Sequence, residues 1–240
     1  PGPSGFEGPI AAKVRELWEP LTDEISVDRL GSVIATKHGR GEEPRPRLLL
    51  AAHLDEIGLM VKQIVNHNGN GFLRLTKLGG VDIRHLYGQT AVVHGQRDLV
   101  GVIGSLPARM LPKERRSKVF GYEDLVVDVG LPESDVNVLV SVGDAISFRQ
   151  PLRKMMDRTV AGKALDNRAS VAAVTLCLEY LEGRAFDWDL VAVATAQEET
   201  RLLGAYTSAF AEQPDAAIAI DVCFAKGAGL SDSPLILGRE

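Results

Sequence analysis

The spacing of apolar residues changes from a helical to a strand-like period within the first sixty positions. Apolar side chains first recur every three or four residues, which is typical of an amphipathic helix. They are Ile10, Val14, Leu17, Trp18 and Leu21. We therefore expect a helix from about Glu7 to Leu21, then a strand around Ser32 to Thr36. The continuous Leu and Ala run at 48–52 predicts a buried strand.

The middle of the chain, from Ile57 to Phe148, has short apolar segments separated by glycine-rich turns. Strand-like segments lie at 59–65, 72–75, 91–93 and 99–103. Asn68-Gly69-Asn70-Gly71 separates the first two, and a turn at 95–98 separates the last two, as in β-hairpins. Many short strands with such turns predict a small barrel or sandwich, which we interpret as an all-β insertion.

The last third returns to alternating strands and helices. A short strand near Thr159 is expected to lead into Asp166, and the elements after it are a helix at 167–181, a strand at 190–196, a helix at 202–211 and a strand at 216–220. Alternation of this kind implies parallel pairing. We predict an α/β fold, with a mostly parallel sheet, helices on both of its faces, and an inserted small β-barrel. The expected domains are 1–58 and 152–240 for the sheet, with 59–151 as the insertion.

Composition removes several functional classes. Hydrophobic residues make up 45% and charged residues 25% of the 240 residues, which is ordinary for a globular domain. The net charge of −5 argues against nucleic acid as a partner. No apolar run is long enough to span a membrane. Two cysteines without CxxC spacing, and no secretory signal at the start, fit a cytoplasmic protein. The chain begins at Pro1 instead of Met, so we expect a trimmed sequence.

Polar residues that follow the predicted strands are the candidates for chemistry. Ligands of open parallel sheets bind beyond the carboxyl ends of the strands. One histidine and four carboxylates are expected there: His53, Asp166, Glu198, Glu199 and Asp221. Four clustered carboxylates repel one another unless cations neutralise them, and two divalent metal ions would do so. Histidine with Asp and Glu is a ligand set that zinc, cobalt or manganese accept in hydrolytic sites.

Each of these residues also has an ordinary structural explanation. The Glu198-Glu199 pair would by itself be a solvated loop, Asp166 a helix N-cap and Asp221 a turn residue. His53 would be a hydrogen-bonded histidine. Their coincidence at four strand ends favours a dinuclear metal site over these separate explanations.

Four ordered motifs resemble the signature segments of the tetrahedral-aminopeptidase family of dinuclear metallopeptidases, which includes glutamyl and leucyl aminopeptidases. The motifs are His53-Leu54-Asp55-Glu56-Ile57-Gly58, Ala164-Leu165-Asp166-Asn167-Arg168, Ala196-Gln197-Glu198-Glu199 and Ile220-Asp221-Val222. The segments 1–7 and 142–144 are also similar, so the resemblance covers essentially the whole chain.

The resemblance implies a role for each motif residue. Asp166 would bridge two divalent metal ions, zinc or cobalt first and manganese as an alternative. His53 and Asp221 would complete one metal site, and Glu199 would bind the other metal. Glu198 would be the general base acting on a metal-bridging water. Asp55 would support the metal-binding histidine. Asn167 departs from the family, where an acidic residue is frequent, but it is not a ligand position.

The family also has a late histidine ligand, whereas no histidine follows His94 here. The resemblance thus implies that a C-terminal part is missing after Leu237 to Glu240, and that this fragment alone is inactive. It further implies that the β insertion forms a homodimer that builds a hollow dodecamer, with peptides as substrates.

Two other functions stay open from the sequence. One is a catalytically silent assembly or peptide-binding relative that lacks the last ligand, and the other is a related metal-dependent hydrolase of the kind once labelled endoglucanase. The complete reading frame separates the first from an enzyme, because a downstream histidine supports catalysis. For glycoside cleavage two carboxylates would suffice, so the histidine and the bridging aspartate favour a metal site.

Overall fold

The computed structural model describes residues 1–105, 108–110, 113–115 and 121–224, and the expectation for Leu237 to Glu240 lies outside them. The chain forms two compact units. We call the first the barrel unit, made of residues 1–10, 55–164 and 197–203, and the second the sheet unit, made of residues 11–54, 165–196 and 204–240. The chain therefore passes from one unit to the other several times.

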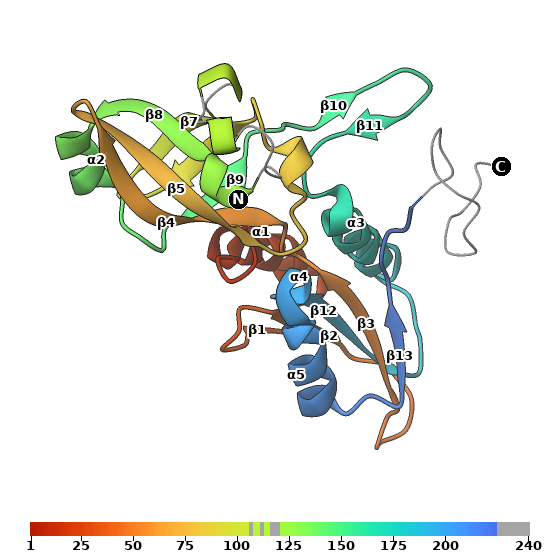
Figure 1. Cartoon of the computed structure of the whole chain (residues 1–240). Helices are drawn as coiled ribbons and strands as arrows, with labels where there is room; N and C mark the ends of the chain where they lie inside the picture. The colour runs from red at the N-terminus through yellow and green to blue at the C-terminus, as the bar shows by residue number, and fades with distance from the viewer. Residues whose placement is uncertain (106–107, 111–112, 116–120, 225–240) are drawn as a thin grey trace. The chain divides into compact units, whose positions relative to one another are not determined.

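Six antiparallel strands close into a barrel (Figure 1). They run in the order β4 (Gly58–His67), β5 (Asn70–Leu78), β8 (Val126–Pro132), β7 (Asp98–Gly104), β6 (Thr90–His94) and β9 (Ala145–Phe148). Alternate side chains point inward, as in β7, where Leu99 and Ile103 are buried while Val100 and Val102 are exposed. The inward residues form one apolar core, so the predicted barrel is confirmed.

Smaller elements complete the barrel unit. The helix α2 (Glu133–Leu139) buries Val136 in the barrel core, and a Cβ on Gly71 would lie 2.7 Å from that valine side chain. Single-turn 3-10 helices lie at Ile83–His85, Ala108–Met110, Lys113–Arg115 and Tyr122–Asp124. The strands β10 (Arg153–Lys154) and β11 (Val160–Ala161) pair only with each other and form a hairpin (Figure 1). The short helix α4 (Glu198–Arg201) also belongs to this unit.

The sheet unit contains a five-stranded mixed sheet. Its order is β1 (Glu24–Val27), β2 (Val33–Lys37), β12 (Asp189–Thr195), β3 (Arg47–His53) and β13 (Ala216–Ala219). The strands β12, β3 and β13 are parallel, whereas β2 is antiparallel to both β1 and β12. Parallel pairing thus holds for β3, which ends at His53, and for β12 and β13, which precede Glu198 and Asp221.

Helices of the sheet unit follow the predicted positions within a few residues. The helix α1 (Gly8–Trp18) continues into a 3-10 turn at Glu19–Leu21, and Trp18 is fully buried. The indole Nε1 of Trp18 donates to Thr175 Oγ1 at 2.8 Å, on the helix α3 (Leu165–Tyr180). The remaining helix is α5 (Leu203–Glu212). Apolar strands and amphipathic helices of this kind confirm the α/β class.

The predicted short strand near Thr159 is present as β11, but it does not belong to the sheet. It pairs with β10 in a hairpin, so the prediction that Asp166 follows a strand of the parallel sheet is wrong. A run of two strand residues with an exposed Val160 has no apolar face to bury against neighbours. Asp166 therefore lies at the start of α3 and does not follow a sheet strand.

Candidate functional site

His53 is the last residue of β3, which lies between β12 and β13 in the sheet, and it is beside Thr195 at the end of β12. Its side chain is only 3% exposed. The ring Nε2 lies 3.0 Å from Asp166 Oδ1 and 4.0 Å from Asp221 Oδ1. The carboxyl ends of parallel strands meet at one sheet edge, which is why these distant sequence positions converge.

The two aspartates reach His53 from different elements. Asp166 and Asn167 are joined by a cis peptide bond and have non-helical backbone angles, so the regular part of α3 begins after them. Asp221 follows β13, whose pairing with β3 continues through the bond from Ile220 N to Ala51 O at 2.8 Å. Both aspartate side chains are more than half exposed, in contrast with the buried imidazole.

Side chains next to the motif residues hold this edge in place. Asn167, 1% exposed, donates from Nδ2 to the carbonyl oxygen of Ile220 at 2.8 Å, immediately before Asp221. Arg168 donates from Nε to the carbonyl oxygen of Leu54 at 3.1 Å, immediately after His53. The sequence did not predict these contacts.

The donor set of His53, Asp166 and Asp221 fits a divalent cation. One atom from each, an imidazole nitrogen or a carboxylate oxygen, lies within 4.8 Å of the others. Imidazole and carboxylate are ligands that zinc, cobalt and manganese all accept. The structure therefore brings three of the predicted metal ligands together in the sheet unit.

In the barrel unit, Asp55 organises the turn that carries Glu198 and Glu199. Asp55 is fully buried, and its Oδ1 and Oδ2 accept the backbone N–H groups of Glu198 and Glu199, each at 3.1 Å. Both glutamates are partly exposed and lie in the first turn of α4. The expected support of His53 by Asp55 stays a prediction, as do the roles of Glu198 and Glu199.

Glu7 is a buried carboxylate that the sequence did not single out. It is 3% exposed, and its Oε1 accepts the N–H groups of Gly5 at 2.7 Å and Gln197 at 3.0 Å. Burial raises the pKa of Glu7 above its ordinary value of 4.5, and Asp55 adds to the rise, although the backbone N–H groups oppose it. Glu7 had been expected to begin a helix, and glutamate is seldom buried, so its role was missed.

Two histidines outside the motifs, His38 and His94, have polar side-chain partners. His94 Nδ1 lies 2.8 Å from Asp98 Oδ1, and its Nε2 lies 2.8 Å from Ser147 Oγ. Ser147 is 3% exposed, so its hydroxyl is closed to substrates and this group supports the barrel wall. His38 contacts Glu24 and Asp189 in the sheet unit.

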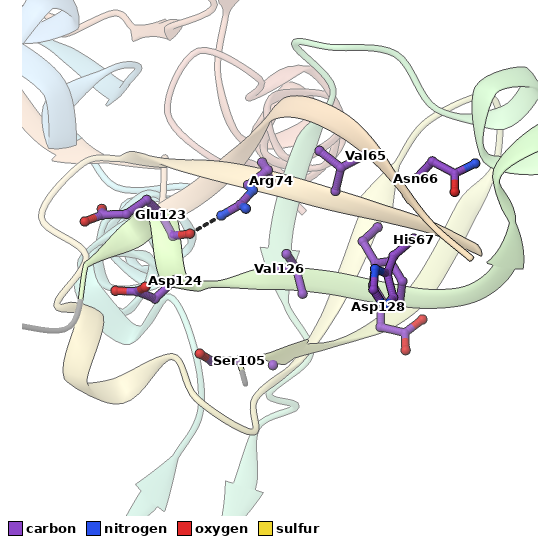
Figure 2. A pocket seen from close by; sticks show the side chains of 11 residues that line it. Val65, Asn66, His67, Arg74, Ser105, Glu123, Asp124, Val126 and Asp128 are labelled. Carbon is purple, nitrogen blue, oxygen red and sulfur yellow. Dashed lines mark hydrogen bonds between the residues drawn. The ribbon is translucent and has the colours of Figure 1, made fainter. Parts of the chain in front are cut away.

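Figure 2 shows a pocket of about 500 Å³ in the barrel unit. Side chains from β4, β5 and β8 line it, with Arg74 donating to the carbonyl oxygen of Glu123 at one end and His67 packed edge-on against Phe72 at the other. None of the residues predicted for the catalytic site lines this pocket.

Among the residues that the structure describes, no helix is both long enough and apolar enough to cross a bilayer.

Comparison with known protein families shows the family to which the chain belongs. A family model described as M42 glutamyl aminopeptidase matches residues 31–235. The chain belongs to this family, as its motifs predict. A lysyl aminopeptidase of Pyrococcus furiosus is 33% identical over 232 residues, which cover 94% of this chain and 64% of that protein.

Solved structures agree with the family. The TET aminopeptidase from the marine sediment archaeon Thaumarchaeota archaeon SCGC AB-539-E09 is 34% identical, with a TM-score of 0.88, and the match covers 96% of this chain and 64% of that one. The TET1 peptidase of Pyrococcus horikoshii is 33% identical, with a TM-score of 0.81, over 95% of this chain and 67% of that one. That peptidase is described as able to assemble into a tetrahedron or a large octahedral shell. The chain spans between 58% and 66% of the length of the curated relatives that it matches.

Proposed function

We propose that this chain is part of a metal-dependent aminopeptidase that removes N-terminal residues from peptides. The observation that carries the proposal is the convergence of His53 Nε2 with Asp166 and Asp221 at the carboxyl edge of the sheet, in a chain of the M42 family. A buried imidazole beside two exposed carboxylates leaves ligand oxygens directed to solvent, where a cation and a substrate have access.

The proposed ligands divide between two divalent metal ions. Asp166 would be shared, His53 and Asp221 would complete one site, and Glu199 would bind the second ion. Zinc or cobalt suits this set best, with manganese as an alternative. When bound, such ions polarise a carbonyl and lower the pKa of water.

The remaining groups would handle protons and the substrate amine. Glu198 would act as the general base, accepting a proton on its carboxylate and passing it to the leaving amine. Asp55 accepts the backbone N–H groups of Glu198 and Glu199, which would help to hold the backbone that carries the Glu198 carboxylate. The acidic surroundings would also attract the protonated amino group of a peptide.

We further propose that the barrel mediates self-association, first to a dimer and then to a dodecamer. Outward-facing valines on neighbouring strands support this, since Val100 and Val102 on β7 are about half exposed and Val92 on β6 pairs with Val100. Assembly of the Pyrococcus horikoshii relative into closed shells also supports it.

The test uses the protein expressed from its whole reading frame, assayed with free and N-acetylated aminoacyl p-nitroanilides. We expect hydrolysis of the free-amine substrates only, loss of activity after chelation, and recovery with zinc, cobalt or manganese. Activity that survives complete metal removal would contradict the metal-dependent mechanism. Tight metal binding without peptide hydrolysis would instead identify a silent binding protein.

A further inference from the structure

Two buried carboxylates accept three successive backbone N–H groups at 197–199, a segment that we call the acidic turn. Glu7 Oε1 accepts from Gln197 at 3.0 Å, and the two oxygens of Asp55 accept from Glu198 and Glu199 at 3.1 Å each. Glu7 is 3% exposed and Asp55 is fully buried. Hydrogen bonds to an ionised acceptor are stronger than neutral ones, particularly away from water.

This turn needs support from outside because its own backbone is short and strained. Gln197 has φ 56° and ψ 37°, and Leu202 has φ 57° and ψ 25°, so non-glycine residues with left-handed backbones bracket α4. Such positions are strained and persist only when surrounding contacts enforce them. The helix itself has four residues, too few to fix its direction by internal bonds.

The segment that presents Glu7 is itself anchored. Ser4 N donates to Glu56 O at 3.1 Å and Glu56 N donates to Gly2 O at 3.0 Å, which makes a parallel bridge. The buried Glu56 side chain accepts from Gly2 N at 3.0 Å and from Lys163 Nζ at 2.8 Å. Hydrogen bonds therefore join the segments 2–7 and 55–56 to each other.

We propose that Glu7 is a positioning residue for the acidic turn. By fixing Gln197 in its left-handed conformation, the Glu7 carboxylate sets the direction in which the backbone enters Glu198. This extends the proposed function, because it rests on Glu198 acting as the general base. Asp55 alone holds the N–H groups of Glu198 and Glu199, and the residue that precedes them is held by Glu7.

The variants Glu7→Gln and Glu7→Leu separate this role from simple packing. Both side chains have nearly the size of glutamate, but only glutamine keeps an oxygen that can accept from Gly5 and Gln197. We expect amide hydrogen exchange at 197–199 to become about tenfold faster or more in Glu7→Leu, since leucine has no oxygen to accept from the N–H group of Gln197. Exchange in the barrel strands should be unchanged. Glu7→Gln should stay near the parent protein.

The control is Glu16→Leu, because Glu16 is exposed on α1 and contacts only the neighbouring Lys13 in the bonds described. If Glu7→Leu fails to fold, Glu7→Asp serves instead, because it keeps the charge but shortens the reach by one methylene group. We expect its exchange at 197–199 to lie between those of the Gln and Leu variants.

In the full-length protein, Glu7→Leu should lower kcat by about tenfold or more with KM within about twofold, because orientation of the base acts on the chemical step. Bound metal should be unchanged because Asp55 still holds the N–H group of the proposed ligand Glu199, and Glu7→Gln should keep kcat near the value of the parent protein. Normal exchange at 197–199 in the folded Leu variant would overturn the proposal. So would an equal rise in exchange throughout the chain, which indicates a general loss of stability.

If the parent protein hydrolyses no peptide with any of the three metals, the proposed function fails, while the exchange comparison still decides whether Glu7 holds the turn.

Discussion

The acidic residues of the candidate motifs and of the segment before them differ in burial, and burial separates their roles. Glu7 and Asp55 are buried, and their carboxylate oxygens accept hydrogen bonds from backbone N–H groups. Asp166 and Asp221, in contrast, are largely exposed beside the buried imidazole of His53. An enclosed carboxylate whose oxygens are already occupied shapes the backbone. An exposed one keeps oxygens available for an ion. Glu198 and Glu199 are intermediate in exposure, so their roles must be separated by experiment.

We expect Glu198→Gln to lower turnover and Glu199→Gln to lower metal content. The amide in Glu198→Gln cannot accept a proton, so turnover should fall by about 10² or more while the metal content is preserved. Glu199→Gln removes a charged ligand and should lower the metal content. Metal analysis and kcat of both purified variants provide the comparison. Equal metal loss in the two proteins would show that the base and the ligand are wrongly assigned.

Among the elements, the turn after β5 lies against the acidic turn. Gly79 has φ +79°, and a Cβ there would lie 3.0 Å from Glu199 Cβ and 3.2 Å from Glu199 Oε2. The glycine thus provides both the left-handed backbone and the space next to the proposed ligand. Gly69, between β4 and β5, has φ +80° and open space around it, so it is a matched control.

We expect Gly69→Ala to destabilise the fold by about 1 kcal/mol, because it puts a Cβ on a left-handed backbone, and Gly79→Ala to destabilise it more, because its Cβ also meets close neighbours. Only Gly79→Ala should also displace Glu199 and weaken metal binding. Urea unfolding combined with metal titration distinguishes the two effects. Identical metal affinity in both variants would mean that Glu199 is not a ligand or tolerates the shift.

Elements with a full apolar period were predictable, and those without one were not. In β7, apolar residues alternate between the inside and the outside of the barrel, and in β3 they form a continuous run. Both patterns predicted the ends of these strands to within one residue. The strand β1 was missed because Glu24–Val27 is an edge strand of four mostly exposed residues, too short to show a clear alternation. The hairpin before Asp166 misled the prediction, because two residues do not show whether a strand joins a sheet or pairs locally.

The same distinction applies to the site. His53, Asp166 and Asp221 were predictable because short motifs carry them. The supporting bonds of Asn167 and Glu7 were not, since they depend on backbone groups 53 and 190 positions away in the sequence.

For the whole molecule, closure of the barrel restricts how copies can associate. A closed barrel has no free strand edge, so association must use its faces, and exposed apolar side chains on a face are the natural contacts. Val100 and Val102 meet this requirement on β7.

We therefore expect the double variant Val100→Glu, Val102→Glu to yield smaller species on light scattering, with metal content retained, because like charges would face one another in a symmetric contact. Val138→Glu, on the exposed side of α2, is the control. A parent protein that is monomeric at micromolar concentration and fully active would refute the proposed assembly.

Pairing of β4 with β9 also has a consequence for the order of folding. The strands β3 and β12 are neighbours in the sheet, yet the whole barrel lies between them in the sequence. Because Leu59 pairs with Ile146, closing the barrel first shortens the loop that joins β3 to β12 from about 135 to about 50 effective residues. The entropy cost of bringing β3 and β12 together then falls by about 1 kcal/mol. Pulse-labelled hydrogen exchange during refolding should accordingly show barrel amides protected before those of β12, and the reverse order would mean that the sheet nucleates alone.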